Sequence, residues 1–233
     1  MGVPRGLIII LLATIVSALG GNPVNAQPPA QNAESPAASV LPKDVYPDSR
    51  NRFPLPQRDD MDDYGRKVFD ELNAFPEIAP TPLRLYSPKL AKPLGEAHHY
   101  LKYETGFPDR LIEIAVMVTA RELDNQYEWT QWETRARTPG DRQVEPAIID
   151  IIKYRKPVAG LGEKETVIIN FGREMFGQKK VSSATFAEAV RLFGRRGTVD
   201  LIELMALYSA TAAELNAVDM QLQRGQKPLL PAR

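Results

Sequence analysis

The sequence predicts an all-α protein that folds as one compact domain of about seven or eight helices. Over most of the chain beyond residue 57, apolar residues recur with the period of an α-helix. Alternating patterns typical of half-buried strands are scarce. Five glycines stand near the expected helix ends, where left-handed caps are common, namely Gly140, Gly160, Gly172, Gly194 and Gly197.

Residues 1–26 are predicted to be a signal peptide. Arg5 precedes the run LIIILLATIVSAL, which is shorter than the roughly 20 apolar residues that a membrane-spanning helix needs. The segment Val24-Asn25-Ala26 ends in a small residue, so we predict cleavage after Ala26 and export to the periplasm or the cell exterior. The alternative is an uncleaved, slightly short membrane anchor.

Residues 27–57 are predicted to form a Pro/Ala-rich arm or linker. This segment holds seven prolines and few large apolar residues, so it cannot bury enough surface to offset the entropy of ordering. Its composition is typical of an extended tether or of an arm laid across a neighbouring subunit. Tyr46 and Phe53 favour the arm.

The helical domain is predicted to span residues 58–224, with a C-terminal tail at 225–233. DDMDDYGRKVFDELNAF places its apolar residues on one stripe, and SPKLAKPLGEAHHYLKYETG predicts a weaker helix broken near Pro93. Pro108 opens FPDRLIEIAVMVTARELD at a favoured first-turn position. The remaining helices are predicted over the segments LDNQYEWTQWE, EPAIIDIIKYRK, EKETVIINFGREMFG, SSATFAEAVRLFG and TVDLIELMALYSATAAELNAV.

Composition excludes several classes of function. The chain has 29 Lys and Arg residues and 29 Asp and Glu residues. It therefore lacks the excess of basic residues that a nucleic-acid-binding surface requires. The chain has no cysteine, which excludes thiol peroxidase, disulfide exchange and cysteine hydrolase chemistry. Two adjacent histidines make a dedicated metal site unfavourable, and the sequence holds no dinucleotide, phosphate-loop or EF-hand motif. We therefore expect no cofactor, although carboxylates alone could bind a hard cation.

Glu113 is the first candidate catalytic residue. It lies in a run that is apolar nearly all round, with Met117 one turn further on, which indicates a buried helix. A carboxylate in such surroundings is desolvated, which raises its pKa and makes it available as an acid or base near neutral pH. The alternative is that Arg110, three residues earlier, neutralises it.

The segment LDNQYEWTQWE supplies a second candidate, Glu128. Asn125 can cap a new helix, and its spacing to Glu128 is that of a capping box. Gln131, Trp132 and Arg135 then share the helix face of Glu128. Tyr127 and Trp129 point elsewhere and are most simply core or interface aromatics, and packing is also the alternative for Trp132.

The order LIEIAVMVTARELDNQYEWTQWE, preceded by RLYSPKLAKPLGEAHHYLKYETGFPDR, resembles the carboxymuconolactone decarboxylase and alkylhydroperoxidase D-like superfamily. The run VSSATFAEAVRLFGRRGTVDLIELMALYSATAAELNAV is similar to that family's second conserved half. The resemblance covers roughly residues 60–222. It implies an all-α fold of alkylhydroperoxidase D-like type that assembles into homo-oligomers, commonly trimers or hexamers.

The resemblance also implies which residues correspond to the family's site. Glu113 matches the glutamate of the peroxidase branch, whereas Asn125 and Glu128 occupy its two cysteine positions and Trp132 its histidine position. Cysteine-free members usually carry a histidine shortly after YEW, and Trp132 stands in that place too. Both the redox dithiol and the histidine of the proton relay are therefore replaced.

His98, His99 and Tyr208 could supply the missing proton transfer. One histidine could converge on Glu113 as a shuttle that titrates near neutral pH, or the pair could be exposed at a helix end. Tyr208, in ALYSA, matches a tyrosine common in the family's second half. It could donate a hydrogen bond into a pocket or be a buried tyrosine bonded to a backbone carbonyl.

Two hypotheses for function follow. The first is an exported, cofactor-free decarboxylase or lactone-processing enzyme acting on a small carboxylated or lactone-type molecule, with Glu113 and Glu128 as proton-transfer groups that point into one cavity. The second is a non-catalytic oligomeric binding or structural protein in which Trp132 fills that cavity. On the first hypothesis the pocket is shaped by Met117, Asn125, Tyr127, Trp129, Gln131, Trp132 and Tyr208.

Overall fold

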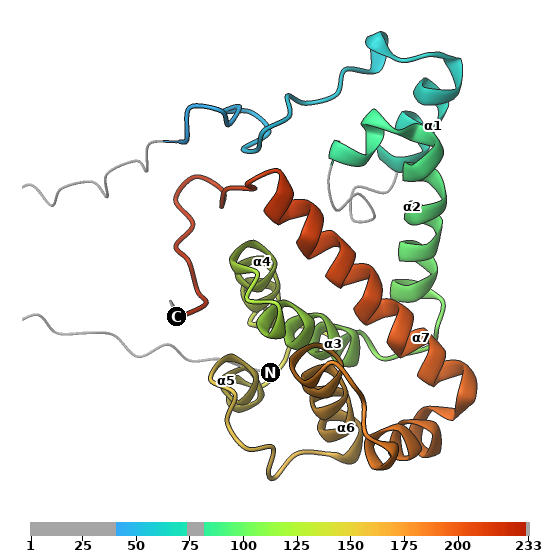
Figure 1. Ribbon diagram of the computed structural model, residues 1–233, viewed down its shortest axis with the longest axis vertical. Helices are drawn as coiled ribbons and strands as arrows, with labels where there is room; N and C mark the ends of the chain where they lie inside the picture. Colours follow the sequence, from blue (N-terminus) through green and yellow to red (C-terminus); the bar gives the residue numbers. More distant parts are fainter. Residues whose placement is uncertain (1–40, 74–81, 232–233) are drawn as a thin grey trace, which may run out of the picture. The chain divides into compact units, whose positions relative to one another are not determined.

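The structure, a computed structural model, describes residues 41–73 and 82–231. These residues contain seven α-helices and three shorter helical segments (Figure 1). Every regular element in these ranges is helical, which confirms the all-α prediction. They belong to one compact unit that begins at Ala38. The predicted signal peptide, and the arm up to residue 40, lie outside the described residues.

The helices follow the order that the apolar periodicity predicts. The three short segments are η1 (Arg58–Asp60), η2 (Pro82–Tyr86) and the π-helical η3 (Arg173–Gln178). The α-helices are α1 (Asp63–Asn73), α2 (Pro88–Tyr103), α3 (Asp109–Glu122), α4 (Gln126–Ala136), α5 (Pro146–Lys153), α6 (Glu163–Gly172) and α7 (Ser183–Ala217).

The break predicted near Pro93 was wrong, because α2 runs through this residue. A proline in a helix removes the hydrogen bond from its own nitrogen to the carbonyl four residues earlier, here that of Lys89. Both residues are exposed, so water can satisfy the freed carbonyl. The loss therefore does not end the helix.

Gly194 and Gly172, two of the predicted helix caps, are glycine for different structural reasons. Gly194 has φ 70° and ψ 175° and divides α7 into the two helices that the sequence predicts there. Gly172 has φ −64°, so its predicted left-handed cap was wrong, as it was for Gly197. A Cβ added at Gly172 would lie 2.6 Å from Val118 Cγ1, which shows that this glycine lets α6 approach α3 closely.

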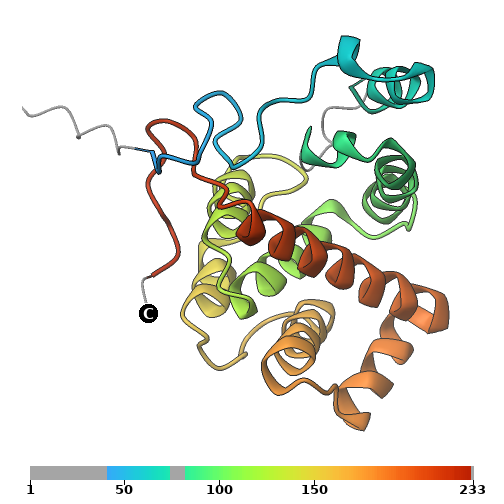
Figure 2. The same cartoon turned by 45° about the horizontal axis from the view of Figure 1, so that its top comes forward.

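Helix α3 forms the centre of the core. Every residue from Leu111 to Arg121 is buried, and α4, α6 and α7 pack against this helix. A second, smaller apolar cluster joins α1, η2 and α2 through Val68, Leu85 and Ala91. Figure 2 shows α7 running past both groups of helices. The long second part of α7 therefore positions residues of the core next to residues of α2.

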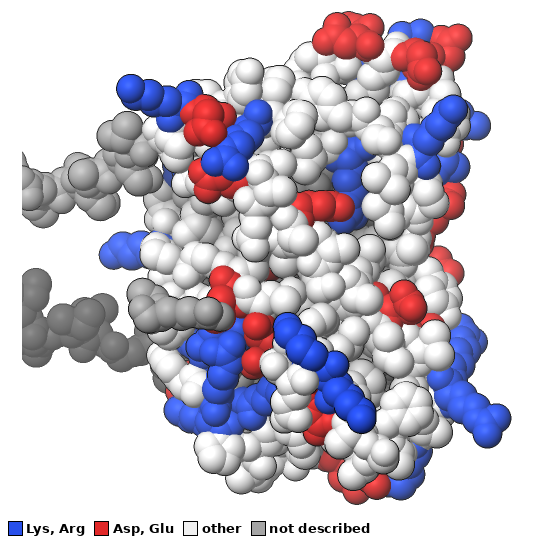
Figure 3. Space-filling view, in the orientation of Figure 1, with Lys and Arg blue, Asp and Glu red and all other residues white. Residues whose placement is uncertain are grey.

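The surface carries charges of both signs. Lys and Arg side chains lie interspersed with Asp and Glu over the face shown in Figure 3, in keeping with the equal numbers of the two classes in the sequence. Within residues 41–73 and 82–231, no helix has the length and apolar character needed to cross a membrane.

Candidate functional site

A pocket of about 480 Å³ lies where α2, α4 and the second part of α7 meet. We call it the Trp132 pocket. It brings together six residues that the sequence analysis selected: His98, Tyr127, Glu128, Gln131, Trp132 and Tyr208. These residues are separated by up to 110 positions in the chain, so only the packing of the three helices assembles them.

Asn125 fixes the start of α4 and thereby the position of Glu128. The backbone N–H of Glu128 donates to Asn125 Oδ1 at 2.8 Å, so the predicted cap forms. The Asn125 amide also donates to the carbonyl of Ala212 at 3.1 Å and to Asn216 Oδ1 at 2.9 Å. The structure therefore places Asn125 behind the pocket, where it joins α4 to α7.

Glu128 is a buried carboxylate that accepts one side-chain hydrogen bond within residues 41–73 and 82–231. Trp132 Nε1, one turn along α4, donates to Glu128 Oε2 at 2.8 Å. Burial raises the pKa of Glu128 from 4.5 to about 7, against the opposing effects of the Trp132 hydrogen bond and the Arg84 charge. The group therefore exchanges a proton near neutral pH.

His98 and Tyr208 form a second buried pair on the pocket wall. His98 Nε2 lies 2.9 Å from the Tyr208 hydroxyl, and the Tyr208 ring packs edge-on against Trp132 with centroids 5.2 Å apart. Only 4% of His98 is exposed, so the exposed-pair alternative was wrong for this residue. The partner of Tyr208 is an imidazole and not a backbone carbonyl.

Burial and nearby charges determine the protonation state of His98 in this pair. Burial, followed by the nearby charges of Lys102 and Arg84, lowers the pKa of His98 to about 3, so the imidazole is neutral at physiological pH. His98 Nδ1 is buried and has no hydrogen-bond partner within the described residues. An orphaned N–H costs more than an orphaned acceptor, which favours the tautomer with the proton on Nε2. Tyr208 then accepts from His98 and can donate its own proton to a bound molecule.

His99 lies apart from this pair. Its side chain is more than one-third exposed, and its Nε2 lies 3.3 Å from Glu104 Oε1. It borders a different pocket, together with Glu71 and Tyr100. The structure thus separates the two adjacent histidines, and only His98 faces the Trp132 pocket.

Glu113 lies behind the pocket wall and pairs with Arg135. Arg135 Nε is 3.0 Å from Glu113 Oε1, while Glu113 Oε2 and Arg135 Nη2 have no partner within the described part of the chain. The alternative partner Arg110 instead contacts Glu145 and Glu165. Burial raises the pKa of Glu113 to about 8, against the charges of Lys102 and Arg142, and the Arg135 contact opposes the same rise.

Met117 and Trp129 lie in the core. Met117 has no exposed surface, as expected from its place in the middle of α3. Trp129 is equally buried, and its Nε1 donates to Glu133 Oε2 at 2.6 Å. Glu133 is also held by Lys153 at 3.0 Å. The structure therefore places these two predicted pocket residues where they stabilise the packing of α3, α4 and α5.

Three basic residues near the pocket were not among the candidate site residues, although the sequence placed Arg135 on the helix face of Glu128. Lys102 Nζ lies 5.2 Å and Arg135 Cζ 4.9 Å from the centre of the Trp132 ring, and both side chains line the pocket. Lys102 follows His98 by one helical turn, a spacing that could have revealed it. Arg84 is buried against Glu214 and Thr211 of α7, and no local pattern marks it.

The arrangement thus combines positive charge with one titratable carboxylate and one phenol. The cations can hold an anion in the pocket, Glu128 can transfer a proton, and Tyr208 can donate a hydrogen bond. The described residues include no group of three or more His, Asp or Glu side chains placed to hold a metal ion.

Comparison with known proteins supports the fold. No protein-family model matches the chain, and no curated protein matches it. Among solved structures, it is similar to the alkylhydroperoxidase AhpD core of an uncharacterized peroxidase-related protein from Ralstonia eutropha JMP134. The match has 15% sequence identity and a TM-score of 0.53, and it covers 75% of this chain and 93% of that one. The predicted alkylhydroperoxidase D-like fold is therefore confirmed.

Proposed function

We propose that this protein is a cofactor-free acid–base enzyme that binds a small carboxylated or lactone-type molecule in the Trp132 pocket. The observation that carries the proposal is the environment of Glu128. This carboxylate is buried, accepts one hydrogen bond from Trp132 and has a pKa of about 7. A proton-transfer group works best when its pKa lies near the working pH.

Decarboxylation is the reaction that fits these groups. Lys102 and Arg135 hold the bound molecule by its negative charge. The bond between the carboxylate carbon and its neighbour breaks, CO₂ leaves, and the electron pair stays on the neighbouring carbon. Protonated Glu128 then donates the proton of the new C–H bond, and solvent restores the proton to Glu128. Tyr208, oriented by His98, donates a hydrogen bond to negative charge that develops on an adjacent oxygen.

This assignment changes the role of Glu113. The sequence hypothesis placed both carboxylates in one cavity, but Glu113 contacts Arg135 from behind and does not line the pocket. We assign Glu113 to positioning Arg135, and the proton transfer to Glu128 alone. We extend the proposal to the rest of the chain as an exported homo-oligomer without nucleic-acid partners, in line with the predicted signal peptide, the charge balance and the family resemblance.

The experiment combines binding and turnover. A panel of small carboxylates and lactones is screened by thermal shift, since a ligand of the folded state raises the melting temperature. Each hit is then incubated in D₂O, and the product is analysed by mass spectrometry for one incorporated deuterium. Glu128→Gln should retain binding and lose turnover, whereas Glu188→Gln, an exposed position on α7, should retain both. Full turnover by Glu128→Gln would refute the proposal.

A second candidate function is binding without catalysis. Trp132 favours it, because only 7% of this residue is exposed and it packs against Tyr208, so it fills part of the space between α4 and α7. The same experiment separates the two functions. Ligands that raise the melting temperature of the wild-type chain but are never converted support a binding protein. If no ligand binds until Trp132→His is introduced, the tryptophan closes the site.

A further inference from the structure

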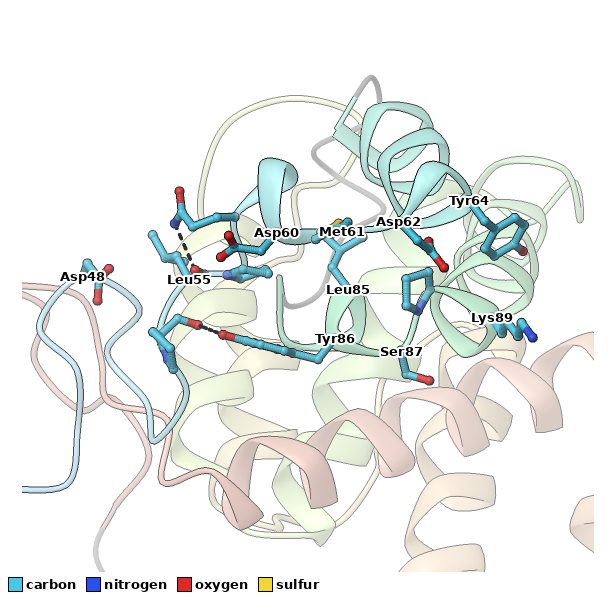
Figure 4. A pocket seen from close by; sticks show the side chains of 14 residues that line it. Asp48, Leu55, Asp60, Met61, Asp62, Tyr64, Leu85, Tyr86, Ser87 and Lys89 are labelled. Carbon is cyan, nitrogen blue, oxygen red and sulfur yellow. Dashed lines mark hydrogen bonds between the residues drawn. The ribbon is translucent and has the colours of Figure 1, made fainter.

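A second cavity, larger than the Trp132 pocket, is an open groove of about 730 Å³ near the start of the described chain. One wall is the segment from Pro54 to Asp62, and the other runs from η2 into the first turn of α2. Figure 4 shows Asp48 at one end and Tyr64 with Lys89 at the other. The Tyr86 hydroxyl donates to the carbonyl of Pro54 at 3.0 Å and bridges the two walls. We call this the Tyr86 groove.

Large apolar side chains gather at this groove and face solvent. The exposed fractions are 36% for Leu55, 43% for Tyr64 and 48% for Tyr86, and Phe53, also 43% exposed, packs on the Tyr86 ring with centroids 5.4 Å apart. Single exposed apolar residues are ordinary, whereas a contiguous set that lines a groove marks a binding surface.

The chemistry of the lining indicates the kind of occupant. Tyrosine rings and prolines form the flat apolar walls on which polyproline II segments dock. Three aspartates, Asp48, Asp60 and Asp62, face one lysine, Lys89, so an occupant with many negative charges is disfavoured. A short extended segment with prolines, small side chains and little charge fits both conditions.

We propose that the Tyr86 groove binds residues 27–40 of a second copy of this chain. This segment, QPPAQNAESPAASV, has fourteen residues, of which three are proline and four alanine, and Glu34 is its only charged side chain. In the polyproline II conformation it would extend about 43 Å, at roughly 3.1 Å per residue. It ends at residue 40, directly before the described chain begins. The segment thus has the composition that the groove requires.

The anchoring of the chain just after this segment favours exchange between two copies. Arg52 donates from its backbone nitrogen to the carbonyl of Val218 at 2.9 Å, and Gln221 donates to the carbonyl of Arg50 at 2.8 Å. The chain then continues from this anchor into the groove wall itself. Residues 27–40 lead into this anchored stretch, and polyproline II segments are stiff, so we assign the groove to the segment of a second copy, and the cross-linking test below separates this arrangement from binding within one chain. A two-fold dimer in which each copy supplies its segment fills both grooves.

The absence of native cysteine allows a direct cross-linking test. The full chain carrying Ser35→Cys is mixed with the full chain carrying Ser87→Cys and oxidised mildly. Ser87 lines the groove, is exposed and makes no capping hydrogen bond, so its substitution should not disturb folding. The matched control is Ser183→Cys, an exposed residue at the first position of α7, the far end from the Val218 anchor.

The expected result is a covalent dimer for the Ser35→Cys and Ser87→Cys mixture and none for the control mixture. Adding Pro28→Ala, Pro29→Ala and Pro36→Ala to the Ser35→Cys chain should remove the dimer band. A cross-link that forms only within one chain carrying both cysteines would overturn the exchange between copies, and equal cross-linking of the control would overturn the site. The test reports on the groove alone, so it is unaffected by whether the Trp132 pocket is catalytic.

Discussion

Glu128→Gln should stabilise the protein at high pH and leave its stability at low pH unchanged. The folded state raises the pKa of this carboxyl from 4.5 to about 7, so it binds the proton more tightly than the unfolded chain does. Below pH 4.5 both states carry the proton and the group costs nothing. As the pH rises toward 7, the unfolded state releases the proton first, and stability falls by about 1.4 kcal/mol per pH unit. Above pH 7 the cost is constant at about 3 kcal/mol.

Glutamine removes this cost because it carries no charge and its amide oxygen can still accept from Trp132 Nε1. The free energy of unfolding of the variant should therefore exceed that of the wild type by up to about 3 kcal/mol at pH 8 and match it near pH 4.5. Urea unfolding at half-unit pH steps measures the difference, and other titrating groups cancel in it. The matched control variant is Glu188→Gln, at an exposed position on α7. A difference between variant and wild type that does not change with pH would refute the assigned burial and pKa.

The remaining predictions concern other contacts of the site and core. Tyr208→Phe leaves His98 Nε2 without its partner and should lower the free energy of unfolding by about 1–3 kcal/mol; an unchanged urea midpoint would contradict the buried pair. Arg135→Gln leaves the Glu113 carboxylate without its cation. Because the pKa of Glu113 is about 8, the variant should lose stability mainly above pH 8, by up to about 3 kcal/mol, and Glu113→Gln in the same chain should restore it. Restoration that fails at high pH would disprove the pairing. Gly172→Ala should lower the free energy of unfolding by about 1–3 kcal/mol, because the added methyl group meets the Val118 side chain of α3. If the variant instead unfolds at the same temperature as the wild type, α6 and α3 can move apart without loss of stability.

The fold was predictable from the sequence because helices follow from local periodicity. Apolar stripes predicted α1 and α3 to α6, and a glycine predicted the division of α7. The errors were also local. Pro93 is tolerated because its lost hydrogen bond faces solvent, and Gly172 serves the contact between two helices, which no single-segment pattern can indicate.

The site was predictable only where its contacts lie on one helix. The bond between Glu128 and Trp132 follows from their spacing of four residues. The bond between His98 and Tyr208 joins residues 110 positions apart, so position in a polar stretch suggested exposure for a histidine that is buried. The partner of Glu113 was mistaken for the same reason, since Arg135 reaches it from the next helix.

The absence of cysteine limits the chemistry that this scaffold can perform. By resemblance, Glu128 stands at a cysteine position of the peroxidase branch and Trp132 at its histidine position, and the two are joined by a hydrogen bond of 2.8 Å. A carboxylate can accept and donate protons but cannot cycle between thiol and disulfide, so no electron transfer to a peroxide passes through it. Burial raises the pKa of the Glu128 carboxyl to about 7. On the proposed function, Glu128 would supply acid–base chemistry without redox chemistry, and the same desolvation that suits it to proton transfer costs the fold about 3 kcal/mol at neutral to alkaline pH.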